Sequence, residues 1–377
     1  MFVLYPGVHS SGVGTRLLTM ICLKIFLTIQ KRSFKMVTFL REDAMLRTID
    51  VHNHLFPLEW IEFLGKRTKS PRMERKGNTM VFYSHEKTGS HISEPGHYDP
   101  ATRIKDMDRC GIDIQILSLT LPSVEELPVD EGVKWAQRIN DYFAEVVHKY
   151  PGRFYAFATL PLQDVKEAVK EIDRAYKELG VKGITMFSNV DFKPLSSPEF
   201  HPIYARAEEY GLPIFIHPGI PFTSEVMKTH GLRNSLYGFT VDTTMAVMSL
   251  IWRGVLEKYP GLNIIHAHLG GIVPYLVQRL EDCWQAEVKE FGASLPKTPS
   301  EYYRRQVYPD SMSAYLPAMR CCLEFVGPQH ICMGTDYAHG IGNWVHAIRS
   351  VKELGLPEKE TNDILGGNAA RICNIKL

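Results

Sequence analysis

Eight short apolar runs, rich in β-branched residues, alternate along the chain with longer segments that carry one apolar face. Runs of about four to eight such residues suit buried strands, whereas the longer amphipathic segments suit helices. The expected strands are residues 48–52, 115–120, 154–160, 183–187, 214–217, 263–268, 307–312 and 330–335. Alternating strands and helices are typical of βαβ units, so the strands should run parallel.

Four of the expected helices are residues 133–149, 165–179, 200–210 and 243–258, the last ending at Tyr259-Pro260-Gly261. The chain contains no G-x-G-x-x-G or Walker loop that would favour a doubly wound sheet. Its 377 residues are enough for a closed barrel, which needs about 250. The sequence therefore predicts an α/β fold, a (β/α)8 TIM barrel.

Two segments interrupt the pattern. Residues 65–100, after the first strand, are polar and too long for a simple loop, so we expect a small insertion over the barrel mouth, with a short strand at 80–83. Residues 1–45 contain an apolar run at 17–29 that is interrupted by Lys24 and too short for a comfortable membrane span. We expect a disordered extension or an upstream start there, a catalytic barrel over 46–377, and no stable membrane association.

Charge and cysteine content exclude some partners. Lys and Arg (43) nearly balance Asp and Glu (42), which gives no reason to expect a nucleic acid or an anionic membrane as partner. The seven cysteines include no C-x-x-C pair, and their odd number suggests reduced thiols. We therefore expect a reducing compartment, the cytoplasm.

Histidines and a carboxylate stand at the ends of four expected strands. Alternate residues of a strand point the same way, so the two histidines of the first strand should face a common point. Barrel active sites lie at the carboxyl ends of the strands, where these residues fall. A lone histidine is more often a packed core residue, but four such strand ends together indicate a metal site. The residues are His52 and His54, His217, His266 and His268, and Asp336.

The chain resembles the amidohydrolase superfamily, in the branch of 2-amino-3-carboxymuconate 6-semialdehyde decarboxylase and related aromatic-acid decarboxylases. The resemblance runs from about Ile49 to the C-terminus and is specific for the branch, not for one substrate. The motifs that carry it are Asp99-Pro100, residues 103–108, Asn140-Asp141, residues 150–154, residues 159–161, His217-Pro218, residues 254–260, residues 267–271, residues 334–337 and Gly367-Asn368-Ala369.

That resemblance implies one divalent metal ion, held by His52, His54, His217 and Asp336. Three imidazoles and one carboxylate suit Zn²⁺, with Mn²⁺ or Fe²⁺ as alternatives. The residue that matches the catalytic histidine is His268, whereas His266 is expected to support it or to pack in the core. Asp336 could also pass a proton. Binuclear relatives carry a carbamylated lysine on the fourth strand, which this chain lacks.

Arg279 matches an arginine that the decarboxylase lends across a dimer interface to a substrate carboxylate, so a homodimer is expected. The second carboxylate-binding arginine of that enzyme falls near Tyr83, and its aromatic contacts are replaced by Gly219 and by Ala338-His339. A substrate held by two arginines is therefore doubtful. His85, His91 and His97 in the insertion show no paired spacing and receive no role.

These residues predict a metal-dependent, non-oxidative decarboxylase of a small aromatic or muconate-type carboxylic acid. Two alternatives stay open. A metal-activated water beside His268 could equally hydrolyse a lactone, an amide or a C–C bond. A barrel without catalysis could serve as a scaffold, although the loss of a ligand that would indicate this is not seen.

Overall fold

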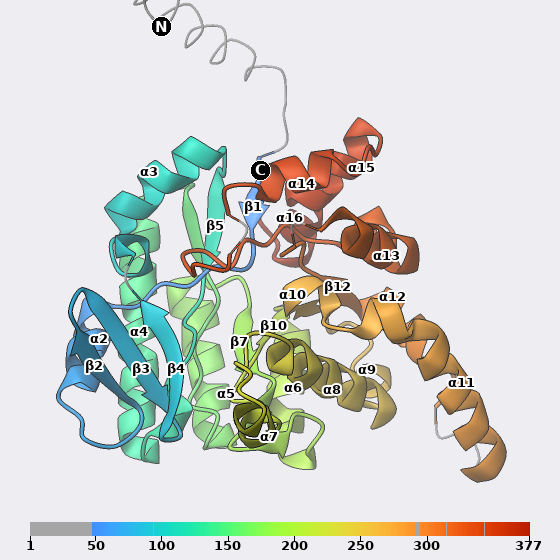
Figure 1. Cartoon of the computed structure of the whole chain (residues 1–377), viewed down its shortest axis with the longest axis horizontal. Coiled ribbons are helices and arrows are strands. Elements are labelled where there is room, and N and C mark those ends of the chain that lie inside the picture. Colours follow the sequence, from blue (N-terminus) through green and yellow to red (C-terminus); the bar gives the residue numbers. More distant parts are fainter. Residues whose placement is uncertain (1–46, 93, 292–294, 314, 343) are drawn as a thin grey trace, which may run out of the picture. The chain divides into compact units, whose positions relative to one another are not determined.

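The computed structural model describes residues 47–377 apart from 93, 292–294, 314 and 343 (Figure 1). Its centre consists of two parallel sheets, one in the order β1-β5-β6 and one in the order β12-β11-β10-β7. The strands are β1 (Ile49–Asp50), β5 (Ile114–Leu117), β6 (Phe154–Ala156), β7 (Ile184–Phe187), β10 (Ile214–His217), β11 (Ile264–His266) and β12 (Val307–Pro309).

Single parallel bridges join the edges of the two sheets. Ala158, just after β6, pairs with Ile184 of β7, and Asp310, just after β12, pairs with Cys332. The chain beyond Cys332 returns to the first strand, where Asn53 pairs with Tyr337. The result is a mixed α/β fold. The expected eighth strand at 330–335 is reduced to one bridge, because its start is the 3-10 turn η5 (Pro328–His330).

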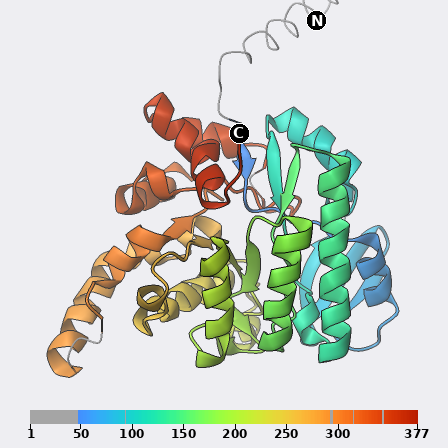
Figure 2. The ribbon, with the colours of Figure 1, turned by 180° about the vertical axis from the view of Figure 1, so that it is seen from behind.

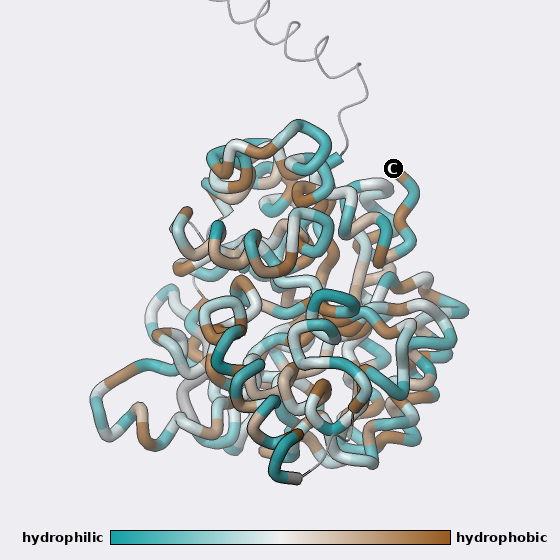
Figure 3. Tube along the Cα trace, turned by 90° about the vertical axis from the view of Figure 1, so that its right-hand side faces the viewer, coloured by the Kyte–Doolittle hydropathy of each residue, from teal (hydrophilic) through white to brown (hydrophobic). Residues whose placement is uncertain are grey.

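Helices cover the outer side of these strands, and Figure 2 shows the green helices lying over them. Many of the apolar segments lie toward the middle of the body, as Figure 3 shows in brown. The helices are α2 (Leu58–Gly65), α3 (Pro100–Cys110), α4 (Val129–Lys149), α5 (Val165–Arg174), α6 (His201–Tyr210), α7 (Ser224–Thr229), α8 (Gly238–Trp252), α9 (Val255–Lys258), α10 (Ala267–Gly270), α11 (Val273–Phe291), α12 (Pro299–Gln306), α13 (Leu316–Val326), α14 (Ala347–Lys352), α15 (Glu358–Asn362) and α16 (Asn368–Ile372).

Local sequence explains how α3 begins and ends. The Asp99 carboxylate accepts hydrogen bonds from the backbone N–H groups of Ala101 and Thr102, which satisfies donors that a helix start leaves free. Pro100 at the first helical position costs no hydrogen bond. Gly111 ends the helix in the left-handed region, with φ 77°. The Asp99-Pro100 motif therefore has a structural reason.

Several of the expected boundaries of strands and helices are confirmed, and others are wrong. The strand at 214–217 agrees with β10 residue for residue, and the helix at 200–210 agrees with α6 to within one residue. The expected helix at 243–258 is wrong as one unit: α8 begins earlier, at Gly238, and Gly254, with φ 74°, separates it from α9. The sixth strand ends at His266 and not at His268, because the chain turns there into α10.

The insertion at 65–100 contains an antiparallel sheet of β2 (Arg72–Lys76), β3 (Thr79–Ser84) and β4 (Lys87–Ile92). The strand expected at 80–83 is confirmed within β3. Alternate β3 residues Met80 and Phe82 are buried in the main hydrophobic core, together with Phe56 and Leu64. The insertion is therefore anchored by the main hydrophobic core, which also contains residues of the parallel strands.

The expected extension at 1–45, with its apolar run, lies outside the described residues. Within the part of the chain that is described, none of the helices is long and apolar enough to cross a membrane. The six cysteines of that part are free thiols, and three of them are buried: Cys322, Cys332 and Cys373.

Candidate metal centre

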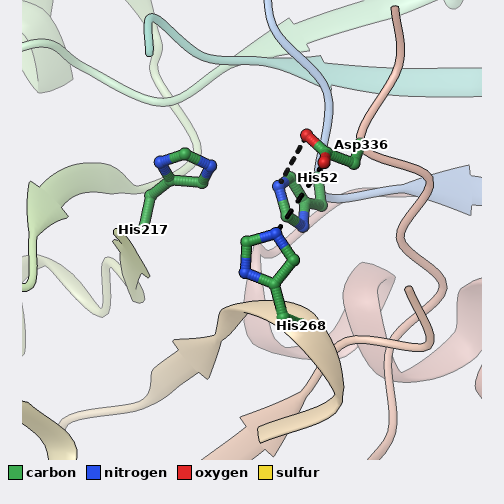
Figure 4. Close-up of side chains that lie close together, drawn as sticks. All are labelled: His52, His217, His268 and Asp336. Carbon is green, nitrogen blue, oxygen red and sulfur yellow. Dashed lines mark ion pairs between the residues drawn. The ribbon is translucent and has the colours of Figure 1, made fainter. Parts of the chain in front are cut away.

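Four side chains from distant parts of the sequence converge at the carboxyl ends of the strands. They are His52 after β1, His217 at the end of β10, His268 in α10 and Asp336 after the last bridge (Figure 4). One nitrogen or oxygen atom of each lies within 4.8 Å of the others. His217 faces the other three from the opposite side.

His54 belongs to the same site. Its ring centroid lies 4.5 Å from that of His217 and 5.2 Å from that of His52, and its Nε2 lies 3.3 Å from Oδ1 of Asp336. With Asp336 and His339 it forms a second group whose donor atoms lie within 4.8 Å of one another. The structure thus brings together all four residues expected to hold the metal.

The polar atoms at this point lack hydrogen-bond partners among the described residues. They are Nε2 of His52, Nε2 of His54, both ring nitrogens of His217 and Oδ1 of Asp336, and all are buried. Buried polar atoms of a protein are nearly always satisfied. Neutral imidazole nitrogens and a carboxylate oxygen that face one another suit a divalent cation, so this donor set fits a metal ion.

Burial and charge set the protonation of these groups. Burial lowers the pKa of His54 to about 3, so its ring is neutral and able to bind a metal. Burial also lowers the pKa of His217 well below its usual value. Although burial alone would raise the pKa of Asp336, the charges of His52 and His339 hold it well below its usual value. Asp336 is therefore ionised.

Two of the candidate ligand histidines, His52 and His54, have hydrogen-bond partners on the side of the ring away from the centre. Nδ1 of His52 lies 2.5 Å from Oδ2 of Asp310, and Nδ1 of His54 lies 3.2 Å from the hydroxyl of Ser118. Each contact occupies Nδ1 and leaves Nε2 facing the centre. Although burial would lower the pKa of His52, the charges of Asp310 and Asp336 raise it to about 10.

A buried polar network lies beneath the first strand. The Asp50 carboxylate accepts hydrogen bonds from the His52 backbone N–H (3.0 Å) and from the Thr335 hydroxyl (2.7 Å), which ties β1 to the segment that carries Asp336. The buried Arg103 guanidinium donates to Asn53 (2.8 Å) and to the backbone oxygen of Gly96 in the insertion (2.9 Å). It also donates to the backbone oxygen of His54.

His268 is presented by a turn of unusual backbone conformation. Four successive residues have positive φ: His268 (56°), Leu269 (58°), Gly270 (74°) and Gly271 (61°). The left-handed region is costly for the two that are not glycine, so neighbouring contacts must impose it. The Leu269 N–H donates to Oδ1 of Asp310 (3.1 Å), and the Ile272 N–H donates to the hydroxyl of Thr244 (2.9 Å). The turn places Nε2 of His268 3.7 Å from Oδ2 of Asp336.

One histidine of the insertion, which sequence reasoning left without a role, reaches the site. Nε2 of the buried His97 lies 3.3 Å from Nδ1 of His339, whose ring also packs against His54 with centroids 5.3 Å apart. No spacing in the sequence pointed to His97, because its partner is 242 residues away. Asp310 was also missed, although it follows β12 and the strand-end criterion used elsewhere would have found it.

The remaining expected residues lie away from the centre. His266 is fully buried below the site, with Nδ1 3.0 Å from the Tyr303 hydroxyl, so it is packed as expected. Arg279 is exposed on α11 and has no hydrogen bond or ion pair within the described part of the chain. Tyr83 donates to Glu74 (3.0 Å) on the outer face of the insertion, while the neighbouring Phe82 is buried against Phe56.

A cavity of about 250 Å³ opens beside His268. Its lining combines apolar side chains with hydroxyl groups and contains no lysine, arginine, aspartate or glutamate. The residues are Ser235, Phe239, Thr240, His268, Leu269, Gly271, Met312, Ser313 and Ile341. A cavity with this lining suits a flat apolar ring better than a charged group.

Comparisons of the sequence with known proteins identify a family and several relatives. A sequence model of the amidohydrolase family matches residues 49–375. The chain is 30% identical over 343 residues to 2-amino-3-carboxymuconate-6-semialdehyde decarboxylase of Dictyostelium discoideum, an alignment that covers 87% of this chain and 91% of the relative. It is also 30% identical over 287 residues to gamma-resorcylate decarboxylase of a Polaromonas species, which covers 72% and 86%.

A solved structure also has a similar fold. The crystal structure of 5-carboxyvanillate decarboxylase from Novosphingobium aromaticivorans, complexed with manganese and 4-hydroxy-3-methoxy-5-nitrobenzoic acid, superposes with a TM-score of 0.75 at 28% identity. The match covers 88% of this chain and 97% of that one.

Proposed function

This chain belongs to the amidohydrolase family, and from that premise we propose that it is a metal-dependent, non-oxidative decarboxylase of a small aromatic carboxylic acid. The relatives named above are decarboxylases, and their alignments cover 72% to 88% of this chain. The resemblance inferred from the sequence motifs is thereby confirmed.

One observation carries the proposal: donor atoms of His52, His217, His268 and Asp336 lie within 4.8 Å of one another at the strand ends. We propose His52, His54, His217 and Asp336 as the metal ligands. A divalent ion held there would act as a Lewis acid and as a template for the substrate carboxylate. Zn²⁺ suits the donor set, and the manganese in the carboxyvanillate decarboxylase makes Mn²⁺ an equal candidate.

His268 is the proposed proton carrier. Decarboxylation without oxidation replaces the carboxylate by one proton: the ring carbon gains H⁺, the C–C bond breaks and its electron pair stays on the ring as CO2 leaves. His268 lines the cavity and lies 3.7 Å from Asp336, so it borders both the substrate space and the metal site. Asp336, being ionised, would orient and stabilise His268 when the imidazole carries the proton.

The surroundings favour an aromatic monocarboxylate over a muconate-type dicarboxylate. The cavity lining contains no cation. At the place where the related decarboxylase carries its second arginine, Tyr83 faces outward and Phe82 faces the core. Within one subunit, the described residues that line this cavity therefore offer no cation for a second carboxylate.

We also propose a barrel fold, a homodimer and a cellular compartment for this chain. The single bridges at Ala158, Asp310 and Asn53 support a closed eight-stranded barrel within residues 46–377, with 65–100 as its insertion. The exposed, unpaired Arg279 supports a homodimer in which each subunit lends this side chain to its partner. The free cysteines support a reducing compartment, which we propose to be the cytoplasm.

The test combines elemental analysis with CO2 release from a panel of hydroxybenzoates and aminocarboxymuconate-type acids. We expect about one metal ion per chain, as the proposed ligand set of three histidines and one aspartate implies. His217→Ala should lose both metal and activity, whereas His268→Ala should keep the metal and lose activity. Metal binding without CO2 release from any acid would favour a hydrolase, to be tested with lactones and esters. A chain that binds no divalent metal after reconstitution would overturn the proposal.

A further inference from the structure

The carboxylate of Asp310 contacts both halves of the candidate site. It is fully buried and directly follows β12. One oxygen, Oδ2, lies 2.5 Å from Nδ1 of His52. The other, Oδ1, accepts hydrogen bonds from the backbone N–H groups of Leu269 (3.1 Å) and Met312 (3.0 Å). We propose that Asp310 is a positioning residue that sets the metal-binding tautomer of His52 and holds the turn that presents His268.

The first part of this role follows from hydrogen-bond chemistry. A carboxylate can only accept, so Nδ1 of His52 must carry the proton in the contact with Oδ2. When a cation is bound and the ring is neutral, the opposite nitrogen, Nε2, therefore carries the free lone pair. That nitrogen is buried and has no hydrogen bond among the described residues, and it faces Asp336 at 3.4 Å. Asp310 thereby fixes which nitrogen of His52 is offered to a cation.

The second part follows from the backbone. His268 and Leu269 both lie in the left-handed region, which neither side chain favours. The hydrogen bond from the Leu269 N–H to Asp310 is made inside this stretch. It ties the turn to β12, whose end is itself held by the bond from the Asp310 N–H to the backbone oxygen of His266 (3.0 Å). One side chain therefore fixes the relative positions of His52 and His268.

Packing leaves little freedom for this carboxylate. A Cβ atom at Gly334 would lie 2.8 Å from the Asp310 Cβ and 2.9 Å from the His52 Cβ. The segment that leads to Asp336 thus passes directly against the pair. A side chain at position 334 would therefore displace Asp310, His52 or both.

This inference rests on the proposed metal site. Two substitutions of Asp310 distinguish its effect on the His52 tautomer from its effect on the turn that carries His268. Asp310→Asn keeps an oxygen for Leu269 and Met312, but its amide N–H₂ would face Nδ1 of His52 and favour the wrong tautomer. Asp310→Ala removes both functions. The matched control is Glu171→Gln, at a buried carboxylate that bonds Asn140 and Arg174 and has no hydrogen bond or ion pair to the site histidines.

The first readout is Mn²⁺ affinity, measured from the paramagnetic resonance signal of free Mn²⁺, which needs no turnover. We expect Asp310→Asn to bind Mn²⁺ about 10- to 100-fold more weakly than wild type. Glu171→Gln should bind it as wild type does. At saturating Mn²⁺, Asp310→Ala should have a lower kcat than Asp310→Asn, with a smaller change in KM, because only the alanine variant loses the anchor of the turn.

A measurement on the wild-type protein covers the case in which the variants do not fold. In protein labelled with ¹⁵N-histidine and loaded with diamagnetic Zn²⁺, His52 should show a protonated Nδ1 and a metal-bound Nε2. An unprotonated or metal-bound Nδ1 would overturn the inference, as would wild-type Mn²⁺ affinity in Asp310→Asn. If wild type binds Mn²⁺ and shows the expected His52 tautomer with Zn²⁺ but releases no CO2, the proposed function fails and the role of Asp310 stands.

Discussion

Nε2 of His97 and Nδ1 of His339 lie 3.3 Å apart beside the candidate metal centre, His97 in the insertion and His339 in the loop after Asp336. His339 also packs against His54, so the contact links the insertion to a candidate ligand. We expect the contact to hold His339 in place beside the substrate.

A double-mutant cycle tests this link. His97→Ala and His339→Ala should each lower kcat/KM, and the double variant should be no worse than His339→Ala alone. A neutral hydrogen bond contributes about 1 kcal/mol, so the coupling should be about fivefold. Additive losses in kcat/KM would show that the two rings act independently.

Removal of the metal should destabilise the fold at the strand ends. A ligand at 100 times its Kd adds about 2.7 kcal/mol to the free energy of unfolding. We therefore expect chelation to lower the Tm of wild type and Mn²⁺ to restore it. His217→Ala should have a Tm that neither treatment changes. His201→Ala, at an outer histidine that bonds Tyr259, is the control and should respond as wild type does.

The dimer proposal predicts complementation between inactive subunits. His268→Ala and Arg279→Ala should each be nearly inactive alone. In a mixed dimer, one site would carry both defects and the other would be intact if Arg279 acts on the partner's site. Mixing and re-equilibrating the two variants should then restore about a quarter of wild-type activity. No restoration, with mixed dimers demonstrated, would place Arg279 outside the partner's site.

Glu126 should make stability depend on pH. Burial raises its pKa from 4.5 to about 8, while it accepts hydrogen bonds from Ser84 and from the His85 N–H (2.7 Å). The folded protein therefore binds a proton more tightly than the unfolded chain does. The stabilisation is complete below pH 4.5 and is lost as the pH rises through 8, by up to about 1.4 kcal/mol per pH unit.

Urea unfolding at pH 5, 7 and 9 checks this sign. As the pH rises, the unfolding free energy of wild type should fall relative to that of Glu126→Gln. Glu59→Gln, at an exposed glutamate paired with Arg138, should run parallel to wild type. A constant difference between wild type and Glu126→Gln would contradict the prediction.

Gly334 should tolerate no side chain. Because an added Cβ would lie 2.8 Å from that of Asp310 and 2.9 Å from that of His52, Gly334→Ala should cost about 1–3 kcal/mol of stability and weaken metal binding. Gly340→Ala, where an added Cβ meets no atom within 4 Å, is the matched control. Equal unfolding free energies for the two variants would refute the expected clash.

The sequence predicted the strands and candidate ligands well where the physical signal is local. His52 and His54 are two residues apart just beyond β1, and His217 ends an apolar run, so the sequence pattern pointed to all three. Strand ends were overestimated where the ladder shortens to single bridges, as at Cys332. The break of the long helix at Gly254 depends on one left-handed glycine, which a periodic apolar pattern does not reveal.

The residues that sequence reasoning missed act through distant partners. His97 gains its contact only because the insertion returns to the loop that carries His339. Asp310 stood at a strand end, but a carboxylate that orients a histidine has no spacing of its own. Its role depends on two backbone N–H groups and one imidazole that only the fold brings together.

Arg103 connects the insertion to the first strand through the oxygens of Gly96, Asn53 and His54. The insertion is therefore not an interchangeable module. A chimera that exchanged residues 65–100 with those of a relative, in order to alter substrate preference, would also change the hydrogen bonds beside His54. Protein engineers who redesign the insertion would have to treat it and the candidate metal centre as one unit.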